Sequence, residues 1–362
     1  MADAAVHSAD ASPLLAVEHL RKVFALRRGW FERGDSPPIR AVDDVSFSIA
    51  NGETLGLVGE SGCGKTTVLR CLLRAIDPTE GSIRFRRQTG AVVDLARLGH
   101  RQLRPLRSEI QMIFQNPFTS LNPRMRLIDI VGDPLLVNGM ASRKARAARV
   151  GELLELVGLP SQYMRRYAHA FSGGERQRIG IARALALQPR LIVADEPVSA
   201  LDVSVQAQVL NLLRELQQRL KLTLLLVSHD LRVVRHLCDR VAVMYLGRIV
   251  ETAPTDSLFT APRHPYTAAL LSSAPSTDPR VRSALQVLPG EVPNPASPPS
   301  GCHFHPRCRL AIERCPEIVP TSETIAADHQ VTCLRAHEWS RVPAADANQT
   351  NRLSSMSPGE HL

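Results

Sequence analysis

The chain has 362 residues, of which 44% are hydrophobic and 4% aromatic, and its formal net charge is +9. This length suits two domains, or one large domain with an appendage. The arginines are scattered along the whole chain and no nucleic-acid-binding module is visible, so we do not expect nucleic acid as a partner. No apolar run approaches the roughly 18 residues that cross a bilayer, and the acidic N-terminus lacks the apolar segment of a secretory signal. We therefore expect a cytosolic chain that reaches a membrane only through partners.

Short apolar runs separated by turn residues predict strands in the first third of the chain. Residues 1–13 are a tail of small residues, which we expect to be flexible. From residue 14 to about 115, the runs L-L-A-V-E-H-L, V-D-D-V-S-F-S-I and T-L-G-L-V-G have the composition of strands, and the last enters a glycine-rich loop. From residue 116 to 171 the pattern turns helical, with apolar positions on one face and arginines on the other.

From residue 172 to about 260, helices alternate again with the apolar runs L-I-V-A, L-T-L-L-L-V and V-A-V-M-Y. Beyond this point the composition shifts to proline, histidine and cysteine, and residues 341–362 are polar and predicted to be disordered. No internal repeat is visible. The predicted domains are a main domain at 14–260, with a helical insert at about 116–171, and a small C-terminal domain at 261–340.

Residues 59–66 read G-E-S-G-C-G-K-T, a phosphate-binding loop between an apolar strand and a helix. Its glycines let the backbone turn tightly, so that successive amide groups and the helix N-terminus point at phosphates. Lys65 should reach the β- and γ-phosphates, and Thr66 should place its hydroxyl on Mg²⁺. We interpret Cys63 as a small residue tolerated in the loop rather than a redox group. The predicted nucleotide-binding residues here are Gly59, Glu60, Ser61, Gly62, Cys63, Gly64, Lys65, Thr66 and Thr67.

Two acidic residues follow the apolar run at 191–194, which has the pattern of a strand buried on both faces. Asp195 can hold Mg²⁺ through water. Glu196, one residue further, can orient the attacking water and accept its proton as general base. A capping acid after a strand would explain either residue alone, but the glycine loop makes a joint catalytic role the better interpretation.

Between the two motifs lies F-S-G-G-E-R-Q, whose Ser172, Gly173, Gly174 and Glu175 open a helix. The glycines allow close approach to a phosphate, the serine hydroxyl can donate to it, and the helix N-terminus favours its charge. The order of phosphate loop, Ser-Gly-Gly and acidic strand resembles the ATP-binding cassette (ABC) ATPases, in which the Ser-Gly-Gly of one subunit closes over the ATP held by another.

The resemblance implies an α/β fold with a P-loop NTPase core of the ABC-cassette type: a mixed sheet with helices, an antiparallel β portion, a helical insert and a small C-terminal domain. ATP and Mg²⁺ are the implied cofactors. Phe171 and Glu175 depart from the commonest family form, L-S-G-G-Q. The Glu175 carboxylate would weaken binding of polyphosphate unless an arginine offsets it, and Arg176 and Arg178 are the candidates.

Four further positions take their roles from the resemblance. Gln115, in M-I-F-Q-N-P, matches the glutamine that reaches Mg²⁺ and water and links the site to the helical insert. His229, in L-L-L-V-S-H-D, matches the histidine that contacts the γ-phosphate. Asp202 ends a stretch that resembles the dimer-contact loop, and Phe24 could stack on adenine, with Trp30 and Phe31 as rivals. The implied catalytic residues are Glu196, His229 and Gln115, and the implied Mg²⁺ ligands are Thr66, Gln115 and Asp195.

The C-terminal part narrows the resemblance. R-H-P-Y-T-A-A-L, L-P-G-E-V-P and G-C-H-F-H-P-R-C look like the extension of oligopeptide and dipeptide importer ATPases, and G-W-F at 29–31 looks like their second-ATPase type. This implies ATP hydrolysis that powers peptide import at the cytoplasmic face of the membrane. The implied partners are two membrane permease subunits, a paralogous ATPase or a second copy, and an extracytoplasmic substrate-binding protein.

Other functions remain open at this point. Nickel importers share the pattern, so the solute is less certain than the class of transporter. A non-transport cassette ATPase would show two cassettes or a long coiled coil, and neither is visible. A phosphate-loop kinase or GTPase would lack the Ser-Gly-Gly segment, and the N-K-x-D guanine motif of GTPases is absent.

Four of the seven cysteines lie close together in the C-terminal part: Cys302, Cys308, Cys315 and Cys333. A cytosolic location argues against disulfides. Their spacing is looser than the paired C-x-x-C of a zinc finger, and an iron–sulfur cluster held by four thiolates fits at least as well. Reduced, buried cysteines without a metal are the alternative.

Overall fold

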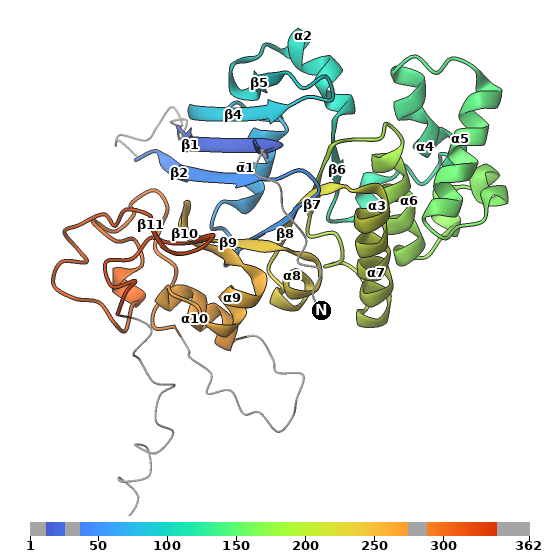
Figure 1. The fold of residues 1–362 in the computed structure, drawn as a ribbon. Coiled ribbons are helices and arrows are strands. Elements are labelled where there is room, and N and C mark those ends of the chain that lie inside the picture. Colours follow the sequence, from blue (N-terminus) through green and yellow to red (C-terminus); the bar gives the residue numbers. More distant parts are fainter. Residues whose placement is uncertain (1–11, 26–36, 274–287, 339–362) are drawn as a thin grey trace, which may run out of the picture.

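The structure is a computed structural model that describes residues 12–25, 37–273 and 288–338. Its described strands form two sheets (Figure 1): a four-stranded sheet of order β2-β1-β4-β5 and an eight-stranded sheet of order β11-β12-β10-β9-β3-β8-β7-β6. The first is antiparallel, and the second is mixed. The predicted combination of a mixed sheet with an antiparallel β portion is therefore confirmed. Trp30 and Phe31 lie outside the described residues.

The antiparallel sheet covers one side of a hydrophobic core that it shares with the second sheet. Its strands are β1 (Leu15–Phe24), β2 (Ile39–Ile49), β4 (Glu80–Arg86) and β5 (Val92–Asp94). Alternate residues of β1, such as Leu15 and Val17, are buried, which is the pattern of a sheet with one face on a core. That core also contains α1 (Lys65–Leu72), which lies between the two sheets in Figure 1.

The second sheet is parallel at its centre and buried on both faces. Its strands are β3 (Thr54–Val58), β6 (Ile110–Ile113), β7 (Leu191–Asp195), β8 (Thr223–Ser228), β9 (Arg240–Tyr245), β10 (Arg248–Pro254), β11 (Glu323–Ala326) and β12 (His329–Val331). In β7, Leu191 and Val193 belong to one hydrophobic cluster and Ile192 and Ala194 to the other. The sheet thus divides two cores, which explains its continuous apolar runs.

Helices cover the face of the second sheet that is turned away from the antiparallel sheet, and residues 116–185 form a helical region at one side of the molecule (Figure 1). The described helices besides α1 are α2 (His100–Leu103), α3 (Pro117–Ser120), α4 (Leu127–Val137), α5 (Arg143–Leu156), α6 (Gly173–Leu185), α7 (Val203–Leu220), α8 (Leu231–Leu237), α9 (Thr255–Thr260) and α10 (Pro265–Ser272). Asn116 caps α3, where the helical pattern was predicted to begin. None of the described helices is long and apolar enough to cross a bilayer.

The C-terminal extension, residues 261–338 as far as they are described, is attached to the main sheet. Its strand β12 pairs antiparallel with β10, Glu251 opposite Val331. The buried Glu251 carboxylate lies 2.8 Å from His329 Nε2 and accepts the backbone amides of Arg263 and His264. A buried carboxylate needs such partners, so this cluster ties two segments of the extension, at residues 263–264 and at residue 329, to β10. The extension and the helical region lie at opposite sides of Figure 1.

Candidate nucleotide-binding site

The phosphate loop connects β3 to α1. At two of its positions, only glycine fits, because neighbouring backbone atoms leave no room for a Cβ atom. Gly64 caps α1 with a φ of 108°, and a Cβ there would lie 2.2 Å from the Ala41 carbonyl oxygen. A Cβ on Gly59 would lie 2.1 Å from the Met244 carbonyl oxygen. Since no side chain tolerates such contacts, only glycine allows the loop to wrap this closely around the start of the helix.

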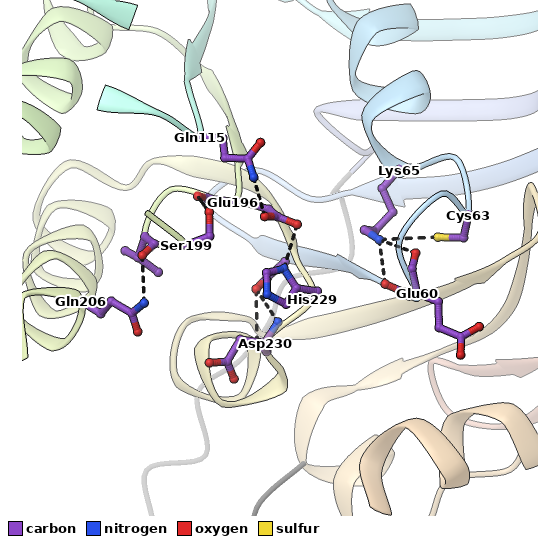
Figure 2. A network of polar contacts seen from close by, with 12 residues as sticks. Glu60, Cys63, Lys65, Gln115, Glu196, Ser199, Gln206, His229 and Asp230 are labelled. Atoms are coloured by element: carbon purple, nitrogen blue, oxygen red, sulfur yellow. Dashed lines mark hydrogen bonds and ion pairs between the residues drawn. The ribbon is translucent and has the colours of Figure 1, made fainter. Parts of the chain in front are cut away.

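The Lys65 ammonium lies inside this loop and is held by the loop's own carbonyl groups. Its Nζ donates to the carbonyl oxygens of Gly59, at 2.7 Å, and Glu60, at 2.9 Å (Figure 2). Cys63 Sγ is 3.7 Å from the same nitrogen. Burial raises the pKa of the Cys63 thiol, so the thiol stays protonated at neutral pH and is a poor nucleophile. This agrees with its interpretation as a small loop residue.

Glu196 occupies a strained position directly after β7. Its φ of 45° is in the left-handed region. This conformation is energetically unfavourable for any residue with a Cβ atom, and it is typical of functional sites. Gln115 Nε2 donates to one carboxylate oxygen at 2.8 Å, and His229 Nδ1 lies 2.9 Å from the other (Figure 2). These residues follow β6, β7 and β8, which are adjacent and parallel, so the sheet brings them to one edge.

Asp195, the last residue of β7, is buried beside this cluster. Burial, and then the neighbouring Glu196 carboxylate, raise the pKa of Asp195. A carboxyl group in such surroundings gains from a nearby divalent cation. Thr66 and Gln115 line the adjacent cavity. Their hydroxyl and amide oxygens, together with the Asp195 carboxylate, form a donor set of oxygen atoms. Such a set suits Mg²⁺ that is also bound by substrate phosphates.

The phosphate loop and the Glu196 cluster face one cavity of about 490 Å³. From the predicted set, Ser61, Gly62, Cys63, Gly64, Lys65, Thr66, Thr67, Gln115, Glu196 and His229 line it. Sequence reasoning missed further lining residues, namely Ile39, Arg40, Ala41, Leu246, Gly247 and Pro295. The start of β2 and the β9–β10 turn carry no phosphate-binding pattern, and Pro295 comes from the distant extension.

Phe24 is not among the described residues that line this cavity. It ends β1 opposite Ile39, is 38% exposed, and has Lys22 Nζ 5.0 Å from its ring centroid. Its partner Ile39 does line the cavity. The contact with adenine therefore stays a prediction for Phe24.

The Ser-Gly-Gly segment forms the N-terminus of α6, away from the cavity. Ser172 is its N-cap, and its hydroxyl donates to the Glu175 carboxylate at 2.8 Å. The Ser172 amide donates to the same carboxylate at 2.9 Å, and the Glu175 amide donates to Ser172 Oγ at 3.4 Å, and these two hydrogen bonds form a capping box. A Cβ on Gly174 would lie 2.3 Å from Val205 Cγ1 of α7, so the second glycine lets these helices pack closely.

Arg176 and Arg178, the two candidates to offset the Glu175 charge, have other partners in this structure. Arg176 donates to the His169 carbonyl oxygen at 2.9 Å and lies over the Phe118 ring. Arg178 donates to the Val157 carbonyl and to Gln208. Both arginine side chains are engaged in these contacts, and in the described part of the chain neither forms an ion pair with Glu175. The carboxylate instead caps its own helix.

The loop between Glu196 and α7 is held from behind by a residue that sequence reasoning missed. Gln206 Nε2 donates to the carbonyl oxygens of Val198 and Leu201, both at 3.0 Å. The Ser199 hydroxyl donates to the Glu196 carbonyl oxygen at 3.1 Å (Figure 2). Asp202 is the N-cap of α7. The predicted dimer-contact loop is thus a rigid turn attached to the Glu196 backbone.

Comparison with known proteins identifies the family. The family model described as ABC transporter matches residues 42–199, and the one described as oligopeptide/dipeptide transporter, C-terminal region, matches residues 250–315. A putative peptide import ATP-binding protein of Brucella ovis is 52% identical over 324 residues, which cover 90% of this chain and 98% of that protein. The chain belongs to the ABC transporter ATP-binding proteins of the oligopeptide/dipeptide family.

Other relatives agree with this assignment. The oligopeptide transport ATP-binding protein AppF of Bacillus subtilis is 51% identical over 331 residues, covering 90% of this chain and 98% of that one. Among solved structures, the ATP-binding cassette MJ0796 in a dimeric post-hydrolysis state with ADP and phosphate is 27% identical, with a TM-score of 0.57 over 67% of this chain and 98% of that one. The cassette fold and the ATPase class expected from the sequence are therefore confirmed.

The four cysteines of the ABC protein's extension converge on one cavity. Cys302, Cys308, Cys315 and Cys333 all line it, together with His264, Phe304 and His305. Burial raises the pKa of the Cys308 and Cys333 thiols to about 11 each. Among the described residues, no three His, Cys, Asp or Glu side chains are placed to hold a single metal ion. Without a bound metal, the Cys308 and Cys333 thiols are protonated at neutral pH.

Proposed function

We propose that this chain binds and hydrolyses ATP to power the import of oligopeptides or dipeptides through separate membrane permease subunits. The observation that carries the proposal is the placement of Glu196 between Gln115 and His229, on the cavity that also contains Lys65. The match of residues 250–315 to the oligopeptide/dipeptide transporter region supports the solute class. An importer of nickel or another solute is the alternative.

In the proposed mechanism, Lys65 exchanges its contacts to loop carbonyls for the β- and γ-phosphate oxygens of ATP. Thr66 and Gln115, with Asp195 acting through water, would hold Mg²⁺, which when bound neutralises phosphate charge. Glu196 orients the attacking water and accepts its proton. His229 and Gln115 fix the direction of the Glu196 carboxylate, because each occupies one of its oxygens.

Each chain is proposed to supply half of two composite sites. Ser172, Gly173 and Gly174 do not line the chain's own ATP cavity, so they are free to close over ATP held by another ATPase subunit. That subunit is either a paralogue, giving a heterodimer, or a second copy, and the composition of the purified complex distinguishes the two. An extracytoplasmic substrate-binding protein would complete the importer.

The permease subunits are proposed to dock beside the helical region. A cavity of about 430 Å³ lies there, lined by apolar side chains and by the cations Arg74, Arg107 and Arg183. Phe114, next to Gln115, lines it and is 45% exposed. A segment inserted here would press on the chain directly before Gln115. Because ATP is supplied in the cytoplasm, we place the chain at the cytoplasmic face of the membrane, held there by these contacts.

The four extension cysteines are proposed to hold an iron–sulfur cluster of the four-iron type. They face one cavity, and a four-iron cubane spaces its thiolates more widely than one zinc ion does. The role would be structural, because ATP hydrolysis needs no redox step. Anaerobically purified protein should contain iron and sulfide, absorb visible light, and lose both when Cys308 is replaced by Ser. Protein with neither iron nor zinc, and with an intact extension, would favour reduced cysteines.

The transport function is tested with the chain co-purified from detergent-solubilised membranes. We expect mass spectrometry to identify two permeases and a second ATPase among the partners. The reconstituted complex should take up a labelled peptide in an ATP-dependent manner. Uptake of nickel but not of peptides would support the alternative solute. A chain that hydrolyses ATP but binds no membrane subunit would contradict import.

A further inference from the structure

Glu60 of the phosphate loop is contacted by the C-terminal extension at two separate groups. Its backbone amide donates to the Tyr266 hydroxyl at 2.9 Å. Its carboxylate accepts two hydrogen bonds from the Arg307 guanidinium, at 2.7 and 3.1 Å, across 247 residues of chain. Its carbonyl oxygen accepts the Lys65 ammonium. One loop residue therefore joins the extension to the predicted phosphate-binding lysine.

The groups of the extension that hold Glu60 are themselves held in place. Arg307 is buried, and its Nε donates to the Pro289 carbonyl oxygen at 3.3 Å. Tyr266 is fully buried, with its ring centroid 4.7 Å from that of Tyr245 and 5.5 Å from that of Phe304. An arginine and a tyrosine fixed in this way lose little freedom when they bind, so they can set the position of a loop.

The Arg307 guanidinium also neutralises the negative charge of the Glu60 carboxylate. A carboxylate in a phosphate loop repels the polyphosphate that binds there, and this repulsion is strong in a partly desolvated site. The Glu60 side chain is directed away from the Lys65 ammonium (Figure 2) and forms a bidentate pair with Arg307, the strongest arrangement for these groups. The pair both neutralises the carboxylate and holds it on the side of the extension.

The extension also contributes directly to the lining of the cavity that contains Lys65. Pro295 lines it, and the Pro295 carbonyl oxygen accepts the backbone amide of Arg40, a residue that lines the cavity as well. The extension thus touches the site at the phosphate loop and at the start of β2. The residues that make these contacts come from different segments of the extension: Tyr266 and Pro295 precede the first of the four cysteines, and Arg307 follows it.

We propose that Arg307 and Tyr266 are positioning residues for the phosphate loop, and that through Glu60 they make the C-terminal extension part of the ATP-binding machinery. This inference rests on the proposed binding of ATP in the cavity. Arg307 fixes and neutralises the Glu60 carboxylate, and Tyr266 fixes the Glu60 amide. The loop geometry that holds Lys65 therefore depends on a segment outside the cassette core.

The test is equilibrium binding of a fluorescent ATP analogue to the full-length chain. Arg307→Ala should raise the Kd by about tenfold, because it leaves the Glu60 carboxylate unpaired beside the phosphates. Arg307→Lys keeps the charge but not the bidentate geometry, and it should raise the Kd by about threefold. Arg314→Ala is the matched control: it removes an exposed arginine from the same extension and should leave the Kd unchanged.

A double variant, Glu60→Gln with Arg307→Ala, distinguishes an effect of Arg307 through Glu60 from a loss of stability of the whole chain. In the presence of Glu60→Gln there is no carboxylate to neutralise, so adding Arg307→Ala should change the Kd by less than about twofold. A double variant as weak as Arg307→Ala alone, or wild-type affinity in Arg307→Ala, would overturn the proposal. Wild-type protein that binds no ATP would instead overturn the proposed function itself.

Discussion

At the scale of single residues, the site is built from side chains whose hydrogen-bonding groups already have partners. Glu196 uses both carboxylate oxygens, one for Gln115 and one for His229, and its backbone is held in an unfavourable region by the Val227 carbonyl. Such preorganisation means that a small chemical change has a large effect on the chemical step and a small effect on the fold.

Replacing Glu196 by Gln should separate hydrolysis from binding. The amide keeps the shape and one acceptor but cannot take a proton, so the rate of hydrolysis should fall by about 10²–10⁴-fold while ATP still binds. Lys65→Ala should instead abolish binding. Turnover by the assembled complex and ATP titration measure the two effects, with the exposed Glu152→Gln as control. Near-normal turnover of Glu196→Gln would contradict its role as the base.

Glu175→Gln addresses the departure in the Ser-Gly-Gly segment. Glutamine can complete the same capping box with Ser172, so α6 should remain intact, while the uncompensated negative charge is removed. The KM of the assembled complex for ATP should fall by about three- to tenfold, as expected for one charge interaction near a phosphate. Glu215→Gln, on the exposed side of α7, is the control. An unchanged or higher KM would show that Glu175 does not repel the nucleotide.

At the scale of elements, helices α4 and α10 provide side chains for contacts outside the two sheets: α4 for the proposed permease contact and α10 for the contact with the phosphate loop. The helical region offers exposed apolar side chains on α4, and α10 carries the tyrosine that holds the phosphate loop. His264, the N-cap of α10, accepts the Tyr266 amide through Nδ1 at 3.1 Å. This hydrogen bond requires the neutral ring.

Docking of the permeases predicts an effect of Val137→Asp on transport alone. Val137 lies at the end of α4, is 63% exposed, and lines a cavity with Arg104, Arg107 and Asp133. A charge there should lower peptide uptake by about tenfold or more, the usual cost of losing an apolar anchor, without changing ATP binding by the isolated chain. Val319→Asp, an exposed position in the extension, is the control. Equal uptake by both variants would place the docking surface elsewhere.

His264 predicts a loss of stability in acid. Burial lowers the pKa of His264 from 6.5 to about 4, so the unfolded chain binds the proton first as the pH falls. The contribution of the neutral ring is complete above pH 6.5 and is lost between pH 6.5 and 4. Between pH 7 and 5 this is about 2 kcal/mol. Denaturant unfolding at both pH values should show a smaller loss for His264→Asn than for the wild type or for His100→Asn.

At the scale of the whole molecule, the parts predicted from residue patterns alone, without the family resemblance, are those whose residues are contiguous. The phosphate loop, the strand before Glu196 and the capped start of α6 each lie within a few positions, where local geometry follows from glycine, apolar and capping patterns. Arg307 and Pro295 were missed because their partners are distant in the chain and no period or motif connects them. The contacts of Arg176 could not be predicted for the same reason: its nearest acid in sequence is not its contact.

The pairing of β12 with β10 has a consequence for how the chain behaves when the extension is absent. A chain cut at Thr260 would leave the amide and carbonyl groups of β10 exposed along a flat edge, and Glu251 would lose the histidine and the two amides that hold its buried charge. Open edges of this kind pair with edges of other chains. The extension therefore also protects the cassette from self-association. A chain without the extension would aggregate, so its transport activity could not be measured.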